Sequence, residues 1–309
     1  MAPGVKTERG IHYQLRGDLS APRGLAVLLH GIGDSAITWD PLALSLVADG
    51  YRVLTLDFLG RGWSSMCDEE DCSLECHLRQ MREVLHVCGL SKTPHVVVCH
   101  SMGSIVGVAH CVDPQGISTA LVLIAPAGAL KKHPVQGLKK FLQGACCCCL
   151  RCCCIPWIAK LLSGDPPIDN DYDRPTKLRQ PPESWLAAGA ERSEWSLSWH
   201  RTFGKQRGAG HPALVMSALR MPFCTVADEV RDMYGIEAGM TASRIRVLVY
   251  TALSDPACGT ATVDMNKYVQ LFPHACVEEE VATRGKHCFH VQDAENVQPK
   301  ILDWLNRMP

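Results

Sequence analysis

Five short, continuously apolar runs, separated by longer segments of helical spacing, constrain the fold of this chain more than any other feature. They are GLAVLLHG (24–31), YRVLTLDFLG (51–60), HVVVCHS (95–101), TALVLIAPAG (119–128) and IRVLVYTALSD (245–255). Apolar and polar residues do not alternate in them, so both faces of each strand are predicted to be buried. A parallel sheet covered by helices on both sides meets that requirement, which indicates a doubly wound α/β fold.

Three segments are predicted to be covering helices: 40–50, 73–90 and 294–309. Gly50 ends the first, because glycine is a typical residue just past a helix. The apolar residues expected on the buried faces are Leu42, Leu44, Leu46, Val47, Leu78, Met81, Leu85, Val87, Val297, Ile301, Trp304 and Leu305.

The alternation of apolar runs with segments of helical spacing stops after Gly128 and resumes near Arg244. Residues 129–212 carry prolines, tryptophans and a block of cysteines, and we interpret them as an inserted lid over the C-terminal edge of the sheet, where α/β proteins bind ligands. Residues 1–128 and 213–309 are then the core. A chain of 309 residues with 47% hydrophobic residues is long enough for one large core and an insertion.

The charge and the cysteine content limit the partners that the protein is expected to bind and the cellular compartment in which it is expected to lie. The 31 basic and 32 acidic residues leave a net charge of −1, so no nucleic-acid partner is expected. The first ten residues, MAPGVKTERG, lack the apolar run of a secretory signal. The 17 cysteines include adjacent runs that cannot all pair, and we interpret most as thiols of a reducing compartment. A cytoplasmic location is expected.

The stretch VVVCHSMGSIVG (96–107) leads from an apolar strand directly into a helix, with Ser101 at the turn. Such a turn holds a nucleophile in a strained backbone, its hydroxyl projecting over the sheet edge, and requires small neighbours. Cys99 stands at the first position of the usual Gly-x-Ser-x-Gly, and Gly103 at the last. Taken alone, the motif is equally compatible with a chance serine in a loop.

The stretch LLHGIGDSAITW ends another strand with a loop that can turn its N–H groups inward. An oxyanion hole needs two such donors, and the main-chain N–H groups of Ile32 and Met102 are the candidates. His30 is interpreted as a structural residue that braces the loop.

Six landmarks in order, HGIGDS, DFLGRGWSS, CHSMGS, LVLIAPAG, VLVYTALSD and GKHCFHVQDAENV, are similar to those of the α/β-hydrolase superfamily. The resemblance is to the single-domain group with an inserted lid that contains esterases and monoacylglycerol lipases, and it covers nearly the whole chain. It implies an α/β-hydrolase fold with a mostly parallel sheet and a lid after the strand ending near Ala125. Asp57, Gly60, Arg61 and Gly62 resemble the family's structural turn. No cofactor and no metal are implied.

The chain order in this fold is serine, acid, histidine. The resemblance implies Asp255, at the end of VLVYTALSD, as the acid; an ordinary Asp-Pro turn is the alternative reading, and Asp228 and Asp232 compete from what reads as an exposed helix face. Of the two histidines near the end, His287 aligns with the family's base, while His290 is expected to pack beneath it.

These residues predict acyl transfer on a small apolar carboxylic ester, with Ser101 as nucleophile. The serine argues against the dehalogenases and epoxide hydrolases of this scaffold, which use an aspartate there. Two alternatives stay open: a carbon–carbon bond hydrolase with the same triad, and a non-catalytic protein that keeps the fold to hold a small ligand.

The predicted lid contains GACCCCLRCCCIPW, which the resemblance does not explain. Residues 129–164 hold six Lys or Arg and no Asp or Glu. One interpretation is a lid docked on an anionic membrane through S-acylated cysteines; another is cysteine as a small apolar filler, and metal binding is third. Arg151 and Pro156 interrupt the apolar run, so no membrane span is expected. The candidate cysteines are Cys146, Cys147, Cys148, Cys149, Cys152, Cys153 and Cys154.

Overall fold

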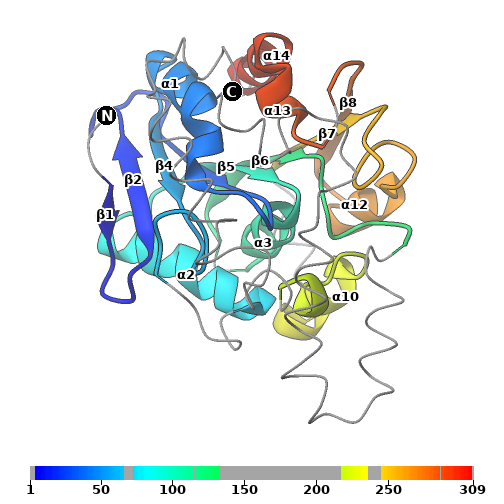
Figure 1. Cartoon of the computed structure of the whole chain (residues 1–309), viewed down its shortest axis with the longest axis horizontal. Helices are drawn as coiled ribbons and strands as arrows, with labels where there is room; N and C mark the ends of the chain where they lie inside the picture. The colour runs from blue at the N-terminus through cyan, green and yellow to red at the C-terminus, as the bar shows by residue number, and fades with distance from the viewer. Residues whose placement is uncertain are drawn as a thin grey trace, which may run out of the picture.

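The structure, a computed structural model, describes residues 4–65, 72–114, 116–132, 217–235, 245–285 and 287–307. Its centre is an eight-stranded sheet in the order β1-β2-β4-β3-β5-β6-β7-β8 (Figure 1). The strands are β1 (Val5–Lys6), β2 (His12–Arg16), β3 (Leu25–Leu29), β4 (Arg52–Leu56), β5 (His95–His100), β6 (Ser118–Ile124), β7 (Arg246–Ala252) and β8 (Cys276–Ala282). β1 and β2 pair antiparallel, as do β2 and β4, and all other neighbours are parallel.

The five predicted apolar runs coincide with β3, β4, β5, β6 and β7, except that β6 begins one residue earlier, at Ser118; this confirms the α/β fold class. Every residue of β3 and β5 is buried, as a strand covered on both faces requires. The runs did not predict β1, β2 and β8, which lie at or next to the edges of the sheet. β8 reads CVEEEVA and is mostly half-buried or exposed, so its sequence lacks the continuous apolar signal.

The three predicted helices are present as α1 (Asp40–Ala48), α2 (Leu74–Val87) and α14 (Ala294–Asn306). α14 packs on α1 on one side of the sheet, and α2 packs on α3 (Met102–Cys111) on the other, next to α10 (Val226–Tyr234) (Figure 1). The predicted burial of Leu44 and Val87 was wrong, since they are 36% and 52% exposed. Leu44 is two residues from both Leu42 and Leu46, which puts it on the opposite side of the helix from them.

Shorter helices complete the description: η1 (Ala36–Trp39), α12 (Met265–Leu271) and α13 (Phe289–Gln292). None of the helices that the structure describes is both long and apolar enough to cross a bilayer. The predicted lid falls almost wholly on residues 133–216, outside the described ranges, and its boundaries stay a prediction. At its start, Ala129 and Leu130 are buried in the core, and the N–H of Leu130 donates to the carbonyl of Phe223.

The parallel arrangement brings the carboxyl ends of the strands to one edge. Ser101 follows β5, Asp255 follows β7, and His287 follows β8. The loop after β3, with Ile32, reaches the same edge. Residues separated by up to 255 positions in the sequence are therefore placed in one region.

Candidate active site

Ser101 stands between β5 and α3 in a strained conformation, with φ 51° and ψ −119°. A non-glycine residue with positive φ is uncommon, and such strain persists only where the surroundings enforce it. Here Ser101 N–H donates to the carbonyl of Ile124 at 3.0 Å, and its own carbonyl accepts from the N–H of Ala127 at 3.2 Å. The end of β6 and the segment that follows it therefore hold the turn on both its N–H and its carbonyl side.

Small residues are required around this turn. A β-carbon on Gly103 would lie 2.5 Å from the carbonyl oxygen of Leu29, so no side chain fits there. A β-carbon on Gly107 would lie 2.2 Å from the sulfur of Cys99. The thiol of Cys99 thus occupies space that Gly107 of α3 leaves free. This explains how the turn at Ser101 tolerates cysteine at the first position of the Gly-x-Ser-x-Gly pattern.

The structure brings Ser101, His287 and Asp255 together. Nε2 of His287 lies 2.8 Å from Oγ of Ser101, and Nδ1 of His287 lies 2.9 Å from Oδ2 of Asp255. A carboxylate only accepts hydrogen bonds, so Nδ1 carries the proton and Nε2 of the neutral ring is free to accept one from the Ser101 hydroxyl. The ring is thereby held in the tautomer that a general base for Ser101 needs.

Asp255 is buried, and the N–H of Ala257 donates to its Oδ1 at 2.8 Å. Burial by itself would raise the pKa of Asp255. The hydrogen bond and charge of His287 and the N–H groups of Ala257 and Cys258 outweigh burial, so the pKa lies below its usual value. Asp255 is therefore an ionised carboxylate at neutral pH, suited to orient an imidazole.

The competing residues are placed elsewhere. The His290 ring packs against His100 and Trp39, at centroid distances of 4.3 and 4.9 Å, and neither of its nitrogens has a hydrogen-bond partner among the described residues. Burial and the charges of His100 and His287 lower the pKa of His290 well below its usual value, so it is neutral. Asp228 and Asp232 lie exposed on α10.

The loop after β3 lies against the nucleophile. A β-carbon on Gly31 would come within 3.2 Å of the Ser101 β-carbon. The carbonyl of Ile32 accepts a hydrogen bond from Nε of the buried Arg61 at 3.2 Å, which fixes this peptide segment. Met102 is the first residue of α3, so its N–H has no acceptor within the helix. Of the two predicted oxyanion donors, Met102 thus directly follows Ser101, and Ile32 follows Gly31, which lies against it.

His30 is buried and bridges two loops. One ring nitrogen pairs with the carbonyl of Gly31 at 2.7 Å, and the other accepts from the N–H of Phe58 at 3.0 Å. Burial lowers its pKa. These contacts support the predicted structural interpretation of His30.

Sequence reasoning missed two residues beside the site, Asp34 and His100. His100 directly precedes the nucleophile, and Nδ1 of its buried ring lies 3.5 Å from Oδ2 of Asp34. With His290 they form the group of described residues that could hold a metal ion, their ligand atoms lying within 4.8 Å of one another. The position of His100 next to Ser101 was the available signal.

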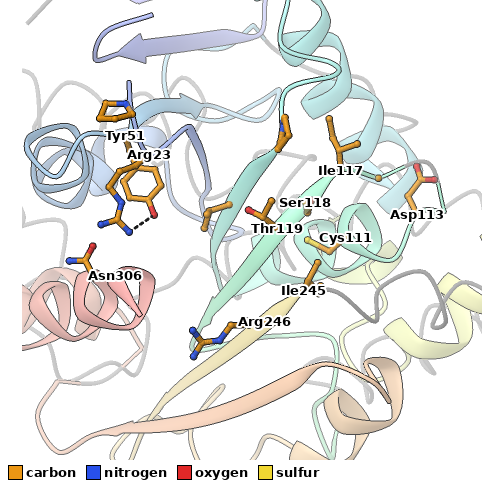
Figure 2. A pocket seen from close by; sticks show the side chains of 14 residues that line it. Arg23, Tyr51, Cys111, Asp113, Ile117, Ser118, Thr119, Ile245, Arg246 and Asn306 are labelled. Carbon is orange, nitrogen blue, oxygen red and sulfur yellow. Dashed lines mark hydrogen bonds between the residues drawn. The ribbon is translucent and has the colours of Figure 1, made fainter. Parts of the chain in front are cut away.

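A cavity of about 880 Å³ lies at the opposite edge of the sheet, where β6 and β7 begin (Figure 2). Arg23, Tyr51, Asp113, Ser118 and Arg246 are among its lining residues. Figure 2 shows the hydrogen bond of 3.2 Å that Arg23 donates to the hydroxyl of Tyr51. Arg246 pairs with Glu278 and lies over the Trp304 ring. The two arginines that line the cavity, Arg23 and Arg246, already have protein partners, which favours a structural role for this edge of the sheet.

The seven cysteines of the predicted acylation cluster lie outside the described residues. The nine cysteines that are described carry free thiols. Burial raises the pKa of Cys99 and Cys258 well above the usual value, so both stay protonated at neutral pH.

Parts of this sequence are similar to known proteins. The chain is 30% identical over 116 residues to a putative carbamate hydrolase, RutD, of Variovorax paradoxus, and 28% identical over 123 residues to a probable lysophospholipase L2 of Haemophilus influenzae. These matches cover 37% and 38% of this chain, and 41% and 39% of the relatives. The matched segments therefore span about two fifths of the length of these relatives.

Among solved structures, an esterase from Exiguobacterium antarcticum is similar over 99% of this chain and 100% of its own, with a TM-score of 0.64 and 14% identity. An enol-lactonase from Burkholderia xenovorans gives a TM-score of 0.64 with 16% identity, over 96% of both chains. Identities this low support the fold alone. The sequence pattern of one family matches residues 26–298, which is most of the chain, and on that ground the chain belongs to the alpha/beta hydrolase family.

Proposed function

We propose that this protein is a serine hydrolase that cleaves an apolar carboxylic ester through an acyl-enzyme. The observation that carries the proposal is the continuous hydrogen-bonded chain from Asp255 through His287 to the strained Ser101. The names of two relatives, a monoglyceride lipase homolog of Monkeypox virus and the probable lysophospholipase, favour a lipid-like ester.

The geometry supports the following steps. Nε2 of His287 takes the proton of the Ser101 hydroxyl while Oγ forms a bond to the ester carbonyl carbon, and the N–H groups of Ile32 and Met102 stabilise the negative oxygen. Collapse breaks the bond to the alcohol oxygen, which receives the proton from His287. A water molecule then attacks the acyl carbon and gives a proton to His287; the bond between that carbon and Oγ breaks, and Oγ takes the proton back from His287, which releases the acid and free Ser101.

A fluorophosphonate probe with intact-mass and peptide readout tests the proposal, because it reports an activated serine without knowledge of the substrate. We expect one label, on Ser101, and none in Ser101→Ala. Ser104→Ala is the matched control, since Ser104 is buried one turn along the same helix. Labelling that persists in Ser101→Ala would contradict the hydrolase proposal, and a folded wild type without label or esterase activity would favour the ligand-binding alternative.

We also propose a cytoplasmic protein whose predicted lid docks on a membrane through S-acylation of the cysteine cluster. The support is the sequence alone: six basic and no acidic residues over 129–164, together with the seven clustered cysteines. Acyl chains should keep the protein on membranes through a salt wash and release it with hydroxylamine, which cleaves thioesters. A variant with all seven cysteines changed to serine should be released by salt alone.

A further inference from the structure

His100 links the nucleophile to the main chain of the proposed base. Its side chain is 2% exposed, and Nε2 lies 2.9 Å from the carbonyl oxygen of His287. A carbonyl oxygen only accepts, so Nε2 must carry a proton and donate it into this hydrogen bond. The residue next to Ser101 thus holds the peptide that carries the imidazole of His287.

The other edge of the His100 ring faces the loop after β3. Nδ1 lies 3.5 Å from Oδ2 of Asp34, and a β-carbon on Gly31 would approach Nδ1 to 3.0 Å. This loop also contains Ile32, the proposed oxyanion donor. His100 therefore lies between the loop that contains Ile32 and the loop that contains His287, both of which must keep their positions relative to Ser101.

Packing leaves the His100 ring little freedom to turn. Its centroid lies 4.3 Å from that of His290 and 4.9 Å from that of His287, with tilted planes. His290 in turn packs on Trp39, which is fully buried. A ring enclosed in this way keeps Nε2 directed at the His287 carbonyl.

We propose that His100 is a positioning residue for the hydrolysis reaction: its Nε2–H, donated to the His287 carbonyl, sets the distance between His287 Nε2 and Ser101 Oγ. The inference rests on the proposed function, since it concerns proton transfer at Ser101. An error of about 1 Å in the position of a reacting group costs about 100-fold in rate. A hydrogen bond to the peptide of the base is well placed to prevent such an error.

Two substitutions separate positioning from packing. The amide nitrogen of His100→Gln reaches the place of Nε2 and can donate to the His287 carbonyl, whereas that of His100→Asn reaches only the place of Nδ1. Both remove the ring and its packing. We expect His100→Asn to lower kcat for a short-chain nitrophenyl ester about 100-fold with little change in KM, while His100→Gln stays within about tenfold of wild type. The rate of fluorophosphonate labelling should follow the same order.

Equal losses in the two variants, or no loss in either, would overturn the proposal. If His100→Asn does not fold, as judged by thermal melting, His100→Met replaces it, because methionine fills the buried space but cannot donate to the His287 carbonyl; the expected loss in kcat is about 100-fold at unchanged KM. An unchanged kcat in His100→Met would then overturn the positioning role.

Two further measurements separate this proposal from its alternatives. Labelling of wild type at Ser101 is recorded first, and its absence contradicts the proposed function itself. If wild type is labelled but His100→Gln and His100→Asn have the same kcat, only the positioning role is contradicted. Wild type is also assayed after treatment with EDTA. We expect no change, and a loss of activity that zinc restores would assign Asp34, His100 and His290 to metal binding instead.

Discussion

Two buried aspartates in this molecule each hydrogen-bond to a histidine, and only one of the pairs leads to a serine. Asp57 Oδ2 lies 2.8 Å from Nδ1 of His12, and Asp255 Oδ2 lies 2.9 Å from Nδ1 of His287. Both carboxyls have a pKa below the usual value, because hydrogen bonding and charge outweigh burial. In distance and in electrostatics the two pairs are nearly alike.

The surroundings of the two pairs differ. Asp57 also accepts the N–H groups of Ala36 at 2.6 Å and Trp63 at 2.9 Å, so its carboxylate ties together two loops and β2. The far side of the His12 ring lies against Gly4, where a β-carbon would come within 1.9 Å of Nε2. Nε2 of His287 instead meets the hydroxyl of Ser101. An Asp–His pair is thus a structural element unless a strained nucleophile lies at the far nitrogen.

The largest expected difference between the pairs is in turnover. His287→Ala should lower kcat for ester hydrolysis by about 10⁶-fold, like Ser101→Ala, because members of a triad act as a unit. His12→Ala should stay within about tenfold per folded molecule, since it removes no group that touches the reacting atoms. Steady-state kinetics on both variants, with folding checked by circular dichroism, makes the comparison. A dead His290→Ala beside an active His287→Ala would move the base to His290.

Substitution of the two aspartates should change kcat by amounts that differ less than those expected for the two histidines. Asp255→Asn should lower kcat about 10⁴-fold, because an amide can favour the wrong tautomer of His287 while the fold survives. Asp57→Asn should keep most of its turnover per folded molecule. The measurement is kcat normalised to the fraction of native protein. Equal losses of kcat in Asp57→Asn and Asp255→Asn would mean that the Asp57 turn contributes to catalysis and that the Asp57–His12 pair is not purely structural.

The sequence predicted the fold and the placement of the site because both depend on local signals. Continuous apolar runs mark buried parallel strands, and Ser101, Asp255 and His287 each follow a strand, so topology alone gathers them. The edge strands were missed, because the half-exposed β8 with its three glutamates has no such signal. The contacts of Asp34 with His100 and of Arg61 with the Ile32 carbonyl were also not predicted, since a contact between residues far apart in the chain leaves no mark in either local sequence.

Stability should reverse the ranking of the two acids. Asp57→Asn places an amide N–H₂ among three donors, so one buried donor loses its acceptor, at about 1–3 kcal/mol, and the two other hydrogen bonds lose the charge of their acceptor, at about 1 kcal/mol each. For a chain of this length we expect Tm to fall by about 5–10 °C, measured by differential scanning calorimetry. Two of the donors to Asp255, Ala257 and Cys258, belong to its own turn, whereas the carboxylate of Asp57 also joins His12 of β2 and the segment of Ala36, so Asp255→Asn should lower Tm by less than half as much. A larger fall for Asp255→Asn would contradict this ranking.

The smallest expected effect is the dependence of the Asp57 contribution on pH. The folded-state pKa of Asp57 lies below the ordinary value of 3.8, so its stabilisation is complete above that value and is lost as the pH falls through the folded pKa. Buried His77 and His110, whose pKa values are lowered by burial from 6.5 to about 3, add a separate loss that begins as the pH falls below 6.5. Because both histidines remain in Asp57→Asn, their effect cancels in the difference between the two proteins. Urea unfolding of wild type and Asp57→Asn from pH 7 to pH 3 should therefore give a difference in unfolding free energy that is constant down to about pH 5 and shrinks below about pH 4. A difference that begins to shrink near pH 6.5 would show that the substitution acts through a histidine, and one that never shrinks would show that the Asp57 carboxylate is not the source of the stabilisation.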